Sequence, residues 1–334
     1  MGSAVAVLAL TACGSDSSGS TKATSPGDAG ASAGEVGKVQ ITLTGGSGSD
    51  TCALSSDSVA AGPVTFTVDN QSATGITEVE LLQDERILGE KENLAPGLDP
   101  VSFTVTLGGG AYHVYCPGAS PEMNDLTVTG KAVEQGGSTQ ALLKRGAQEY
   151  ATYADTQVTA MVHGVVALQR AVDSGDLAAA RKAYAEARPY YERIESDVDG
   201  FVLPGFKPTD NRGNLDYLID MRASNLDPAV GWHGFHAVER DLFARHAITA
   251  STKKLAAELT RNVKKLDIVV KRLSYKPEDL ANGAASLLEE VQSNKITGEE
   301  EKYSHIDLVD FAGNLEGAKE AFAYLEPGLK KIDA

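Results

Sequence analysis

The hydrophobic pattern of this 334-residue chain changes its period once, and that change constrains the fold more than any other feature. From residue 38 to 130, short stretches of alternating apolar and polar residues are separated by turns such as APG, GGG and CPG. Such alternation is typical of half-buried strands. After a linker at 131–138, KAVEQGGS, apolar residues recur at helical spacing instead. We therefore expect a multidomain chain with an all-β sandwich at 38–130 and an all-α helical bundle at 139–334.

Individual elements follow from the same patterns. The expected strands are 39–44, 64–68, 78–82, 101–107, 112–115 and 126–129. The expected helical segments are 140–173, 177–195, 215–222, 234–246, 250–272, 280–294 and 298–325. In the last helix, the expected buried stripe is Leu308, Phe311, Ala312, Leu315, Ala318 and Phe322. Extending this column backwards predicts that His305 and Glu301 also enter the interior.

Charge restricts the kinds of partner. The formal net charge is -16, and the chain lacks the clustered Lys and Arg that nucleic acid requires. The same charge favours repulsion from anionic lipid headgroups and attraction to cations. Because 42% of the residues are hydrophobic, both domains can build real cores. We therefore expect cations rather than nucleic acid as partners.

The N-terminus has the features of an export signal. Residues 4–12, AVAVLALTA, are apolar but too short to span a membrane. Leu10-Thr11-Ala12-Cys13 resembles a bacterial lipobox, in which Cys13 becomes the lipidated first residue. A Ser/Gly/Ala-rich tether at 14–37 would then separate the anchor from the first domain. We expect a lipoprotein signal at 1–13 and an exported protein, either on the cell membrane facing outward or periplasmic; an ordinary signal peptide with a chance cysteine is the alternative.

His236 and Glu239 are the first candidate metal ligands. Phe235, Val238 and Leu242 form an apolar stripe around them, so the segment is expected to be a helix with both polar side chains on one face. An imidazole and a carboxylate so placed make half of a first-row metal site. A histidine satisfied by a nearby glutamate at a packed helix edge would leave the same pattern. From spacing alone, both interpretations remain open.

Cys52 and Cys116 are the second candidate pair. Two cysteines in an exported domain most often form a disulfide. The alternative is a soft metal site that adds Glu78 or Glu80, with Met123 as a weaker ligand. A blue-copper centre normally has two histidines, and residues 38–130 contain one. A conventional electron-transfer copper site is therefore not expected.

Several motifs in the correct order carry a family resemblance. They are E-x-E-L-L at 78–82, E-K-E-N-L-A-P-G at 90–97, A-R-x-x-Y-E-R-I-E at 187–195, G-F-H-x-x-E at 234–239, and K-I-T-G-E-E-x-x-Y-S-H-x-D-L-x-D-F at 295–311. With them the chain resembles the EfeO family of EfeUOB iron-uptake systems, which pairs a cupredoxin-like domain with an imelysin-like, peptidase-like domain. The resemblance covers nearly everything after the tether.

The resemblance implies two sets of metal ligands. In the helical domain these are His236, Glu239, Glu192, Glu195 and Asp220, the last in an I-D-x-R element with Arg222, with Asp216, Glu301, His305 and His163 as further candidates. In the cupredoxin-like domain they are Cys52, Cys116, Glu78 and Glu80, with Met123 as a further candidate. The implied cargo is iron, as Fe²⁺ or Fe³⁺, with copper an alternative in the first domain and zinc a surrogate. Family members usually continue for about two more helices, which predicts an underpacked bundle here.

The same resemblance implies an iron permease in the membrane and a haem-type peroxidase as partners. Peptidase activity is disfavoured, because an H-x-x-E-H zinc peptidase needs a second histidine where this chain has Arg240. Whether the first domain oxidises iron stays open. The alternative function is that of a surface polysaccharide-binding or adhesin lipoprotein, which would need an aromatic-lined groove. Trp232 is the single tryptophan, which favours metal binding for iron uptake.

Overall fold

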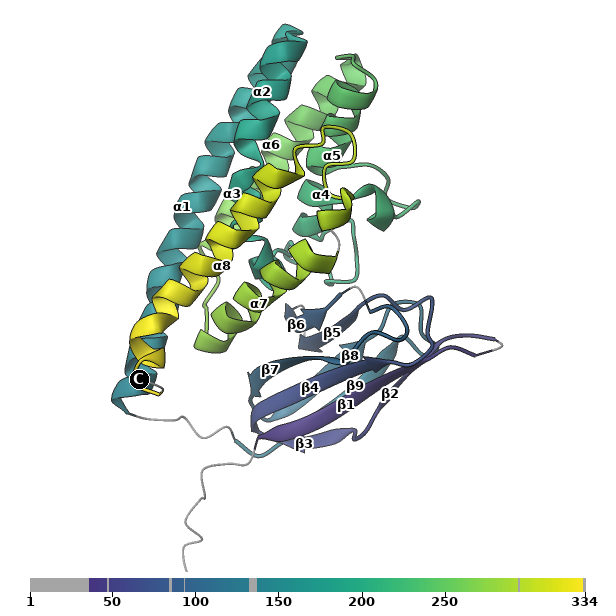
Figure 1. Ribbon diagram of the computed structural model, residues 1–334, viewed down its shortest axis with the longest axis vertical. Helices are drawn as coiled ribbons and strands as arrows, with labels where there is room; N and C mark the ends of the chain where they lie inside the picture. The colour runs from purple at the N-terminus through teal and green to yellow at the C-terminus, as the bar shows by residue number, and fades with distance from the viewer. Residues whose placement is uncertain are drawn as a thin grey trace, which may run out of the picture. The chain divides into compact units, whose positions relative to one another are not determined.

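The computed structural model describes residues 36–46, 48–83, 86–92, 94–131, 137–293 and 295–332 (Figure 1). The signal and lipidation site expected at 1–13, and all but the end of the tether at 14–37, lie outside this part of the chain. Most of the linker expected at 131–138 lies outside it as well.

Among the described residues, the first region forms strands in two sheets. The strands are β1 (Gly37–Thr44), β2 (Thr51–Leu54), β3 (Ser58–Ala60), β4 (Gly62–Asn70), β5 (Val79–Gln83), β6 (Arg86–Lys91), β7 (Val101–Leu107), β8 (Gly110–Tyr115) and β9 (Met123–Thr129). One sheet has the order β2-β1-β4-β7 and the other β3-β9-β8-β5-β6. The pairs β1 with β4 and β3 with β9 are parallel, and the remaining pairs are antiparallel.

The sandwich core follows from the alternation in the sequence. Ile41 in β1 and Phe66 in β4 are fully buried, and Phe66 stacks on Phe103 of β7 with ring centroids 5.2 Å apart. All six expected strands are present, so the predicted sandwich is confirmed. The structure adds β2 and β3, which are too short to show a period, and β6, whose sequence RILGEK is largely polar.

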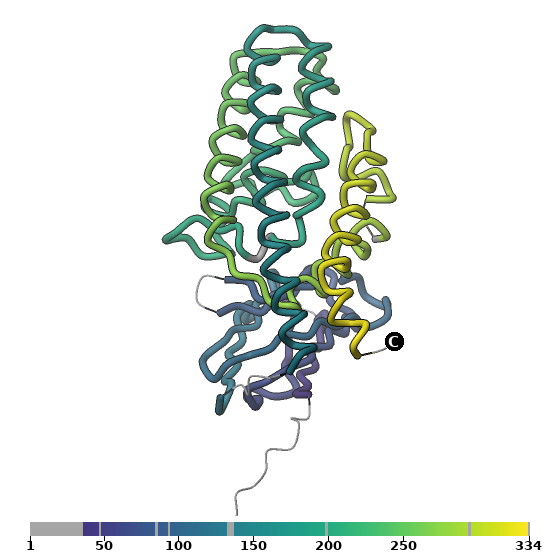
Figure 2. The backbone as a smooth tube through the Cα atoms, turned by 90° about the vertical axis from the view of Figure 1, so that its left-hand side faces the viewer, coloured from purple at the N-terminus to yellow at the C-terminus, as the bar shows by residue number. Residues whose placement is uncertain are grey.

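The second region is helical. Its α-helices are α1 (Ser138–Ser174), α2 (Leu177–Ala187), α3 (Pro189–Glu192), α4 (Leu215–Asp220), α5 (Gly234–Glu239), α6 (Ala250–Val270), α7 (Pro277–Ser293) and α8 (Asp307–Leu329). Short turns of other helix types are η1 (Glu195–Gly200), η2 (Ala223–Asn225), η3 (Arg240–Ala244) and η4 (Lys295–Thr297). Figure 2 shows α1 running alongside α2 and α6, with which it packs.

Local residues explain where these helices break. Gly175, with a φ of 79°, ends α1, and the Asp176 side chain caps α2 by accepting a hydrogen bond from the Ala179 N–H at 2.9 Å. Pro189 then begins α3, which turns the chain so that Glu192 is fully buried. The expected helical segment 177–195 is therefore two helices followed by the turn η1.

Helix α8 corrects two predictions. It begins at Asp307 rather than residue 298, because Gly298 and His305 have φ values of 77° and 56°, which no right-handed helix accommodates. Most of the residues expected to form its buried stripe lie on the exposed face of the helix. Leu308, Leu315 and Phe322 are 79%, 59% and 55% exposed.

Small residues on α8 face the bundle instead. A Cβ added to Gly313 would lie 2.6 Å from the Glu192 Cβ, and one added to Gly317 would lie 2.3 Å from the Arg193 carbonyl oxygen. Glycine therefore permits α8 to approach α3 closely, which is how Asp310 and Asn314 come to be buried beside it.

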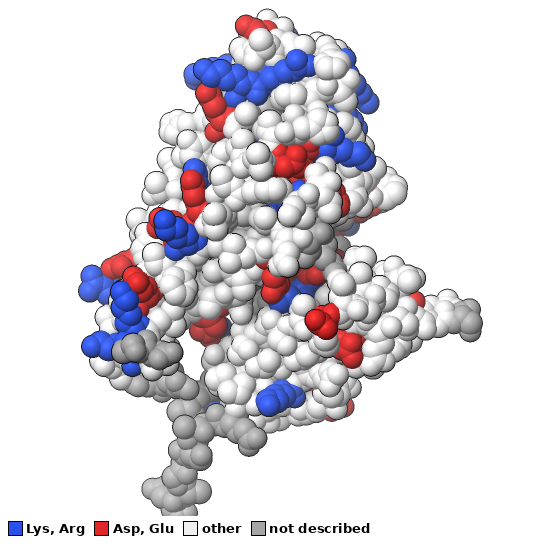
Figure 3. Space-filling model, in the orientation of Figure 1, with Lys and Arg blue, Asp and Glu red and all other residues white. Residues whose placement is uncertain are grey.

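The charges on the visible surface are mixed. On the face in Figure 3, Lys and Arg gather in a band across the top, and lower down they lie beside Asp and Glu. No helix among the described residues has both the length and the apolar composition needed to cross a membrane.

Candidate metal centre

The helical bundle encloses a cluster of charged side chains. Within the described chain, the buried carboxylates that belong to this cluster are Glu192, Glu195, Asp220, Glu239, Glu300, Glu301 and Asp310. The buried cationic side chains of this cluster are Arg188, Arg222 and Lys295, together with the His236 imidazole. Carboxylates outnumber the permanent cations, so the interior holds an excess of negative charge that protons or a bound cation must offset.

The chain positions His236 through a close contact between two short helices. Gly234 begins α5 with a φ of 72°, and a Cβ there would lie 2.1 Å from the Ile219 carbonyl oxygen. Glycine therefore lets α5 approach the end of α4, where Asp220 lies. Phe235, on the next position, is fully buried and anchors the helix in the core.

One nitrogen of His236 is held by Glu239. The imidazole Nδ1 lies 3.2 Å from Glu239 Oε2, and the other oxygen of Glu239 accepts hydrogen bonds from the N–H groups of Tyr303 and Ser304 at 2.6 and 2.7 Å. Burial raises the pKa of Glu239, but hydrogen bonds from His236 and these amides outweigh it and hold that pKa below its usual range. Glu239 is therefore ionised, and both of its oxygens already have partners.

The other nitrogen of His236 has no hydrogen bond. Its Nε2 lies 3.5 Å from Asp220 Oδ1 and 3.4 Å from Glu300 Oε1, and the imidazole is 2% exposed. Burial lowers the pKa of His236, but the charge of Asp220 and interactions with Glu239 and Glu300 raise it well above its usual range. The protonated ring thus serves as a cation between the carboxylates, and a metal ion at Nε2 would replace its proton.

Glu300 joins this imidazole to a second cation. Its Oε2 lies 3.7 Å from the Nζ of Lys295, which contacts Glu192 Oε2 at 2.6 Å and Glu195 Oε2 at 2.7 Å. Burial raises the pKa of Glu300, but Lys295, Arg222 and His236 hold it well below its usual range.

The Arg188 guanidinium is the centre of the network. It forms ion pairs with Glu192, Asp220, Glu300, Glu301 and Asp310. Its Cζ also lies 5.1 Å from the centroid of the Phe235 ring. Because it is fully buried, Arg188 fixes the spacing of acidic side chains that would otherwise repel one another.

Three groups of side chains have ligand atoms close enough to share a metal ion: Asp220, His236 and Glu300; His236, Glu239 and Glu301; and Glu192, Glu195 and Glu300. Within each group the atoms lie within 4.8 Å of one another. Carboxylate oxygens with one imidazole are a donor set suited to Fe(II), Fe(III) and Mn(II).

The sequence-based candidates divide clearly. His236, Glu239, Asp220, Glu192, Glu195 and Glu301 all belong to the buried cluster. Asp216 is half-buried, accepts a hydrogen bond from the Tyr191 hydroxyl and belongs to none of the three groups. The candidates His163 and His305 belong to none of the three groups, and both are exposed: His163 lies on the outer face of α1, and His305 adopts the left-handed conformation before α8.

Sequence reasoning did not identify Glu300, Lys295 or Arg188 as parts of the site. Lys295 and Glu300 lie in the K-I-T-G-E-E motif, and Arg188 in A-R-x-x-Y-E-R-I-E, so the motifs contained the information. Helical periodicity could not place Glu300 in the site, since residues 298–306 are not helical.

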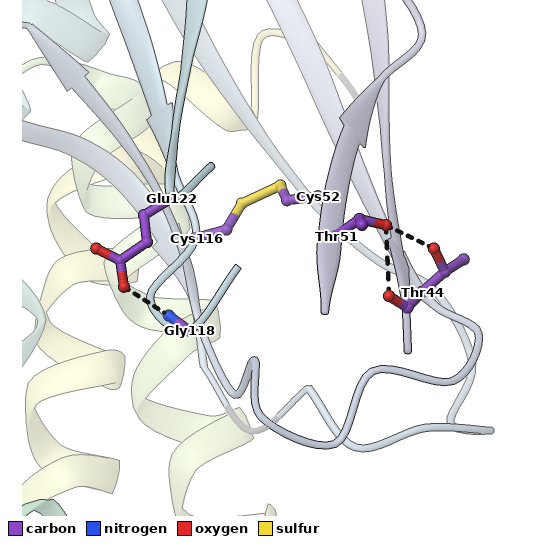
Figure 4. The surroundings of a disulfide bond; sticks show 6 residues. All are labelled: Thr44, Thr51, Cys52, Cys116, Gly118 and Glu122. Carbon is purple, nitrogen blue, oxygen red and sulfur yellow. Dashed lines mark hydrogen bonds between the residues drawn. A yellow bond between two sulfur atoms is a disulfide. The ribbon is translucent and has the colours of Figure 1, made fainter. Parts of the chain in front are cut away.

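The β-sandwich resolves the open question about its cysteines. Cys52 and Cys116 form a disulfide in the sandwich core, with Cα atoms 6.4 Å apart (Figure 4). Neither sulfur is then a thiolate ligand.

The other candidates in the sandwich lie on the opposite face. Glu80 pairs with Tyr115, and Tyr115 pairs with Met123, whereas Val79 and Leu81 on either side of Glu80 enter the core. Because side chains alternate along a strand, Glu80 and Met123 point away from the disulfide. Glu78 lies just before β5. The structure therefore does not assemble the predicted Cys–Glu–Met site.

The fold and cluster define a class of protein: a β-sandwich followed by an imelysin-type helical domain with a buried acidic centre. The imelysin family model matches residues 146–334. The iron uptake system component EfeO of Escherichia coli (strain K12) is 32% identical over 308 residues, covering 91% of this chain and 77% of that protein. EfeO of Shigella flexneri matches with the same identity and coverage. The chain therefore belongs to the EfeO family.

A solved structure is similar to the first domain. Rusticyanin from Thiobacillus ferrooxidans, at 16% identity and a TM-score of 0.23, covers 28% of this chain and 79% of its own.

Proposed function

We propose that this protein is an exported iron-binding component of an EfeUOB-type uptake system, in which the helical domain captures an iron ion and delivers it to a membrane permease. Anchoring through a lipidated Cys13 would keep the domain near that permease. A haem-type peroxidase would be the third component of the system.

The observation that carries the proposal is the unbonded Nε2 of His236. This buried imidazole nitrogen makes no hydrogen bond and faces carboxylate oxygens of Asp220 and Glu300 at 3.5 and 3.4 Å, so a metal ion that replaces its proton would meet one nitrogen and two oxygen donors. Asp220 and Glu300 supply the hard oxygen donors that iron prefers. We assign His236, Asp220 and Glu300 as the ligands of the iron ion.

Glu239 then has a different role from that of a ligand. By accepting a hydrogen bond from the Nδ1–H of His236, Glu239 would fix the tautomer whose Nε2 lone pair is available to the metal. Its hydrogen bonds to the amides of residues 303 and 304 also hold the loop that follows Glu300.

Two observations disfavour the alternatives. The residue after Glu239 is Arg240, so the second histidine of an H-x-x-E-H peptidase is missing. The Arg240 Cζ lies 4.3 Å from the ring centroid of Trp232, so the guanidinium stacks on one face of this ring. That ring face is then not available to stack on a sugar.

The test is iron content after anaerobic loading with Fe²⁺ and removal of free metal. His236→Ala and Glu300→Gln should each lose one equivalent at near wild-type helicity. Glu239→Gln should keep that equivalent but bind it roughly 10–100-fold more weakly, as expected for an orienting partner. Glu316→Gln, a control on the exposed side of α8, should bind as wild type does. Wild-type stoichiometry and affinity in Glu300→Gln would refute the ligand assignment.

A further inference from the structure

Lys295 is a buried ammonium group enclosed by acidic side chains. Its side chain is fully buried, and its Nζ lies 2.6 Å from Glu192, 2.7 Å from Glu195, 3.7 Å from Glu300 and 3.9 Å from Glu290. Asn314 supports this arrangement, because its Nδ2 donates to Glu195 Oε2 at 3.1 Å and to the Glu192 carbonyl oxygen at 3.0 Å. The ammonium thus lies where several carboxylate oxygens converge.

The carboxylates around Lys295 form one of the three potential metal-binding groups, Glu192 with Glu195 and Glu300. Glu300 also belongs to the group at His236: its Oε1 faces the imidazole and its Oε2 faces the ammonium. A carboxylate that offers one oxygen to each of two neighbouring cation positions has the arrangement of a bridging ligand in a two-metal centre.

We infer that Lys295 occupies the second cation position of a two-metal carboxylate centre and thereby restricts the helical domain to a single metal ion. The inference rests on the proposed function, because it takes the first position, at the unbonded Nε2 of His236, as the iron site. It adds that the bundle contains ligands for two ions and fills one position with its own side chain.

The covalent attachment of the ammonium explains why a free cation does not replace it. Lys295 follows α7 in the turn η4, so its ammonium cannot diffuse away. If a metal ion displaced the ammonium of Lys295, that ammonium would stay inside the protein without its carboxylate partners. The free-energy cost of this unpaired buried charge exceeds what a hydrated metal ion gains by entering. A metal ion at the His236 position meets no such obstacle, since it replaces only a proton.

Mn²⁺ binding to the full chain tests this inference. Removing the ammonium in Lys295→Met leaves its carboxylate partners uncompensated, so this variant should bind one more Mn²⁺ per chain than wild type. Two ions that share Glu300 would lie about 3.5–4 Å apart and give an exchange-coupled electron paramagnetic resonance spectrum. Wild type should give only the spectrum of isolated Mn²⁺.

Lys271→Met is the matched control, because Lys271 also pairs with two carboxylates, Asp155 and Asp267, but is 50% exposed. It should bind the same number of ions as wild type. If Lys295→Met is unfolded without metal, recovery of helicity on adding Mn²⁺ would support the inference.

Three results would overturn it: an unchanged ion count in folded Lys295→Met, a variant that stays unfolded in saturating Mn²⁺, or a coupled spectrum in wild type. A wild-type chain whose ion count equals that of His236→Ala would instead contradict the proposed iron site, so the two failures are distinguishable.

Discussion

The interiors of the β-sandwich and the helical bundle differ in how much buried charge they contain. The sandwich core consists of apolar residues and the Cys52–Cys116 disulfide, and buried Asn70 is satisfied by backbone groups of Ala73 and Leu94. The bundle has an apolar core of its own but adds the buried network around Arg188 and His236. Both regions therefore have an apolar core, and the bundle differs by the buried charge network that it adds.

The difference separates what holds a domain together from what a domain does. Apolar burial stabilises by about 25 cal/mol per Å² whatever cations are present. Buried charges cost desolvation, and a hydrophobic replacement of similar volume is often as stable. Such a network at the centre of a bundle is therefore better explained by cation binding than by stability. The following predictions test that contrast, in order of decreasing effect.

The largest effect is expected from removing the cation at the centre of the network. Arg188→Met leaves five carboxylates without their common partner, and breaking a buried ion pair in this way typically costs about 3–5 kcal/mol. The measurement is the free energy of unfolding in urea, followed by the fluorescence of Trp232. Arg145→Met, which breaks an exposed pair with Glu149, should cost no more than about 1 kcal/mol. Equal effects of the two variants would contradict the contrast.

The second prediction concerns metal removal. Free Mn²⁺ at 100 times its dissociation constant should stabilise the bundle by about 2.7 kcal/mol, and a chelator should reverse this. Hydrogen exchange resolved by mass spectrometry reports both regions in one experiment. Amides of α1 and α6 should gain protection, while those of β1 and β4 should exchange at an unchanged rate. Equal protection of the strands would show that the sandwich also responds to the ion.

The third prediction uses pH. Burial raises the pKa of Glu301 from 4.5 to about 7, so between these values the folded bundle holds a proton that the unfolded chain has lost. The free energy of unfolding should therefore fall as pH rises from 4.5 to about 7, by at most about 1.4 kcal/mol per pH unit for this group. Above pH 7, Glu301 should contribute no further change. Glu301→Gln should flatten the slope of unfolding free energy against pH. Glu316→Gln, whose carboxylate is 56% exposed, should keep it.

The same contrast explains how far the sequence could be interpreted. The strands were predictable because residues such as Val39, Ile41 and Leu43 alternate with polar ones, and a sheet with one buried face requires that pattern. His236 and Glu239 were recognisable because one helical turn brings them together. Both patterns are local, so no knowledge of tertiary packing was needed.

The remaining features depend on tertiary contacts. Helix α8 offers a large apolar face with Leu308, Leu315 and Phe322 and a small-residue face with Gly313 and Gly317, and hydrophobic periodicity selects the former. The chain uses the latter because only glycine permits the approach to Glu192. The site of Glu300 and Lys295 likewise could not be placed, since the turn that contains them has no period.

The smallest effect is expected in the sandwich. Ile41→Val removes one buried methylene from β1 and should cost about 0.5–1.5 kcal/mol. Because the loss is one of apolar packing, its size should be the same with and without Mn²⁺. Ile268→Val, the same change at a site 53% exposed on α6, should alter stability by less than about 0.5 kcal/mol. Urea unfolding of both variants, followed by hydrogen exchange in β1 and β4 and in α6, measures the difference. A dependence of the Ile41→Val effect on the metal would mean that the two interiors are energetically coupled rather than independent.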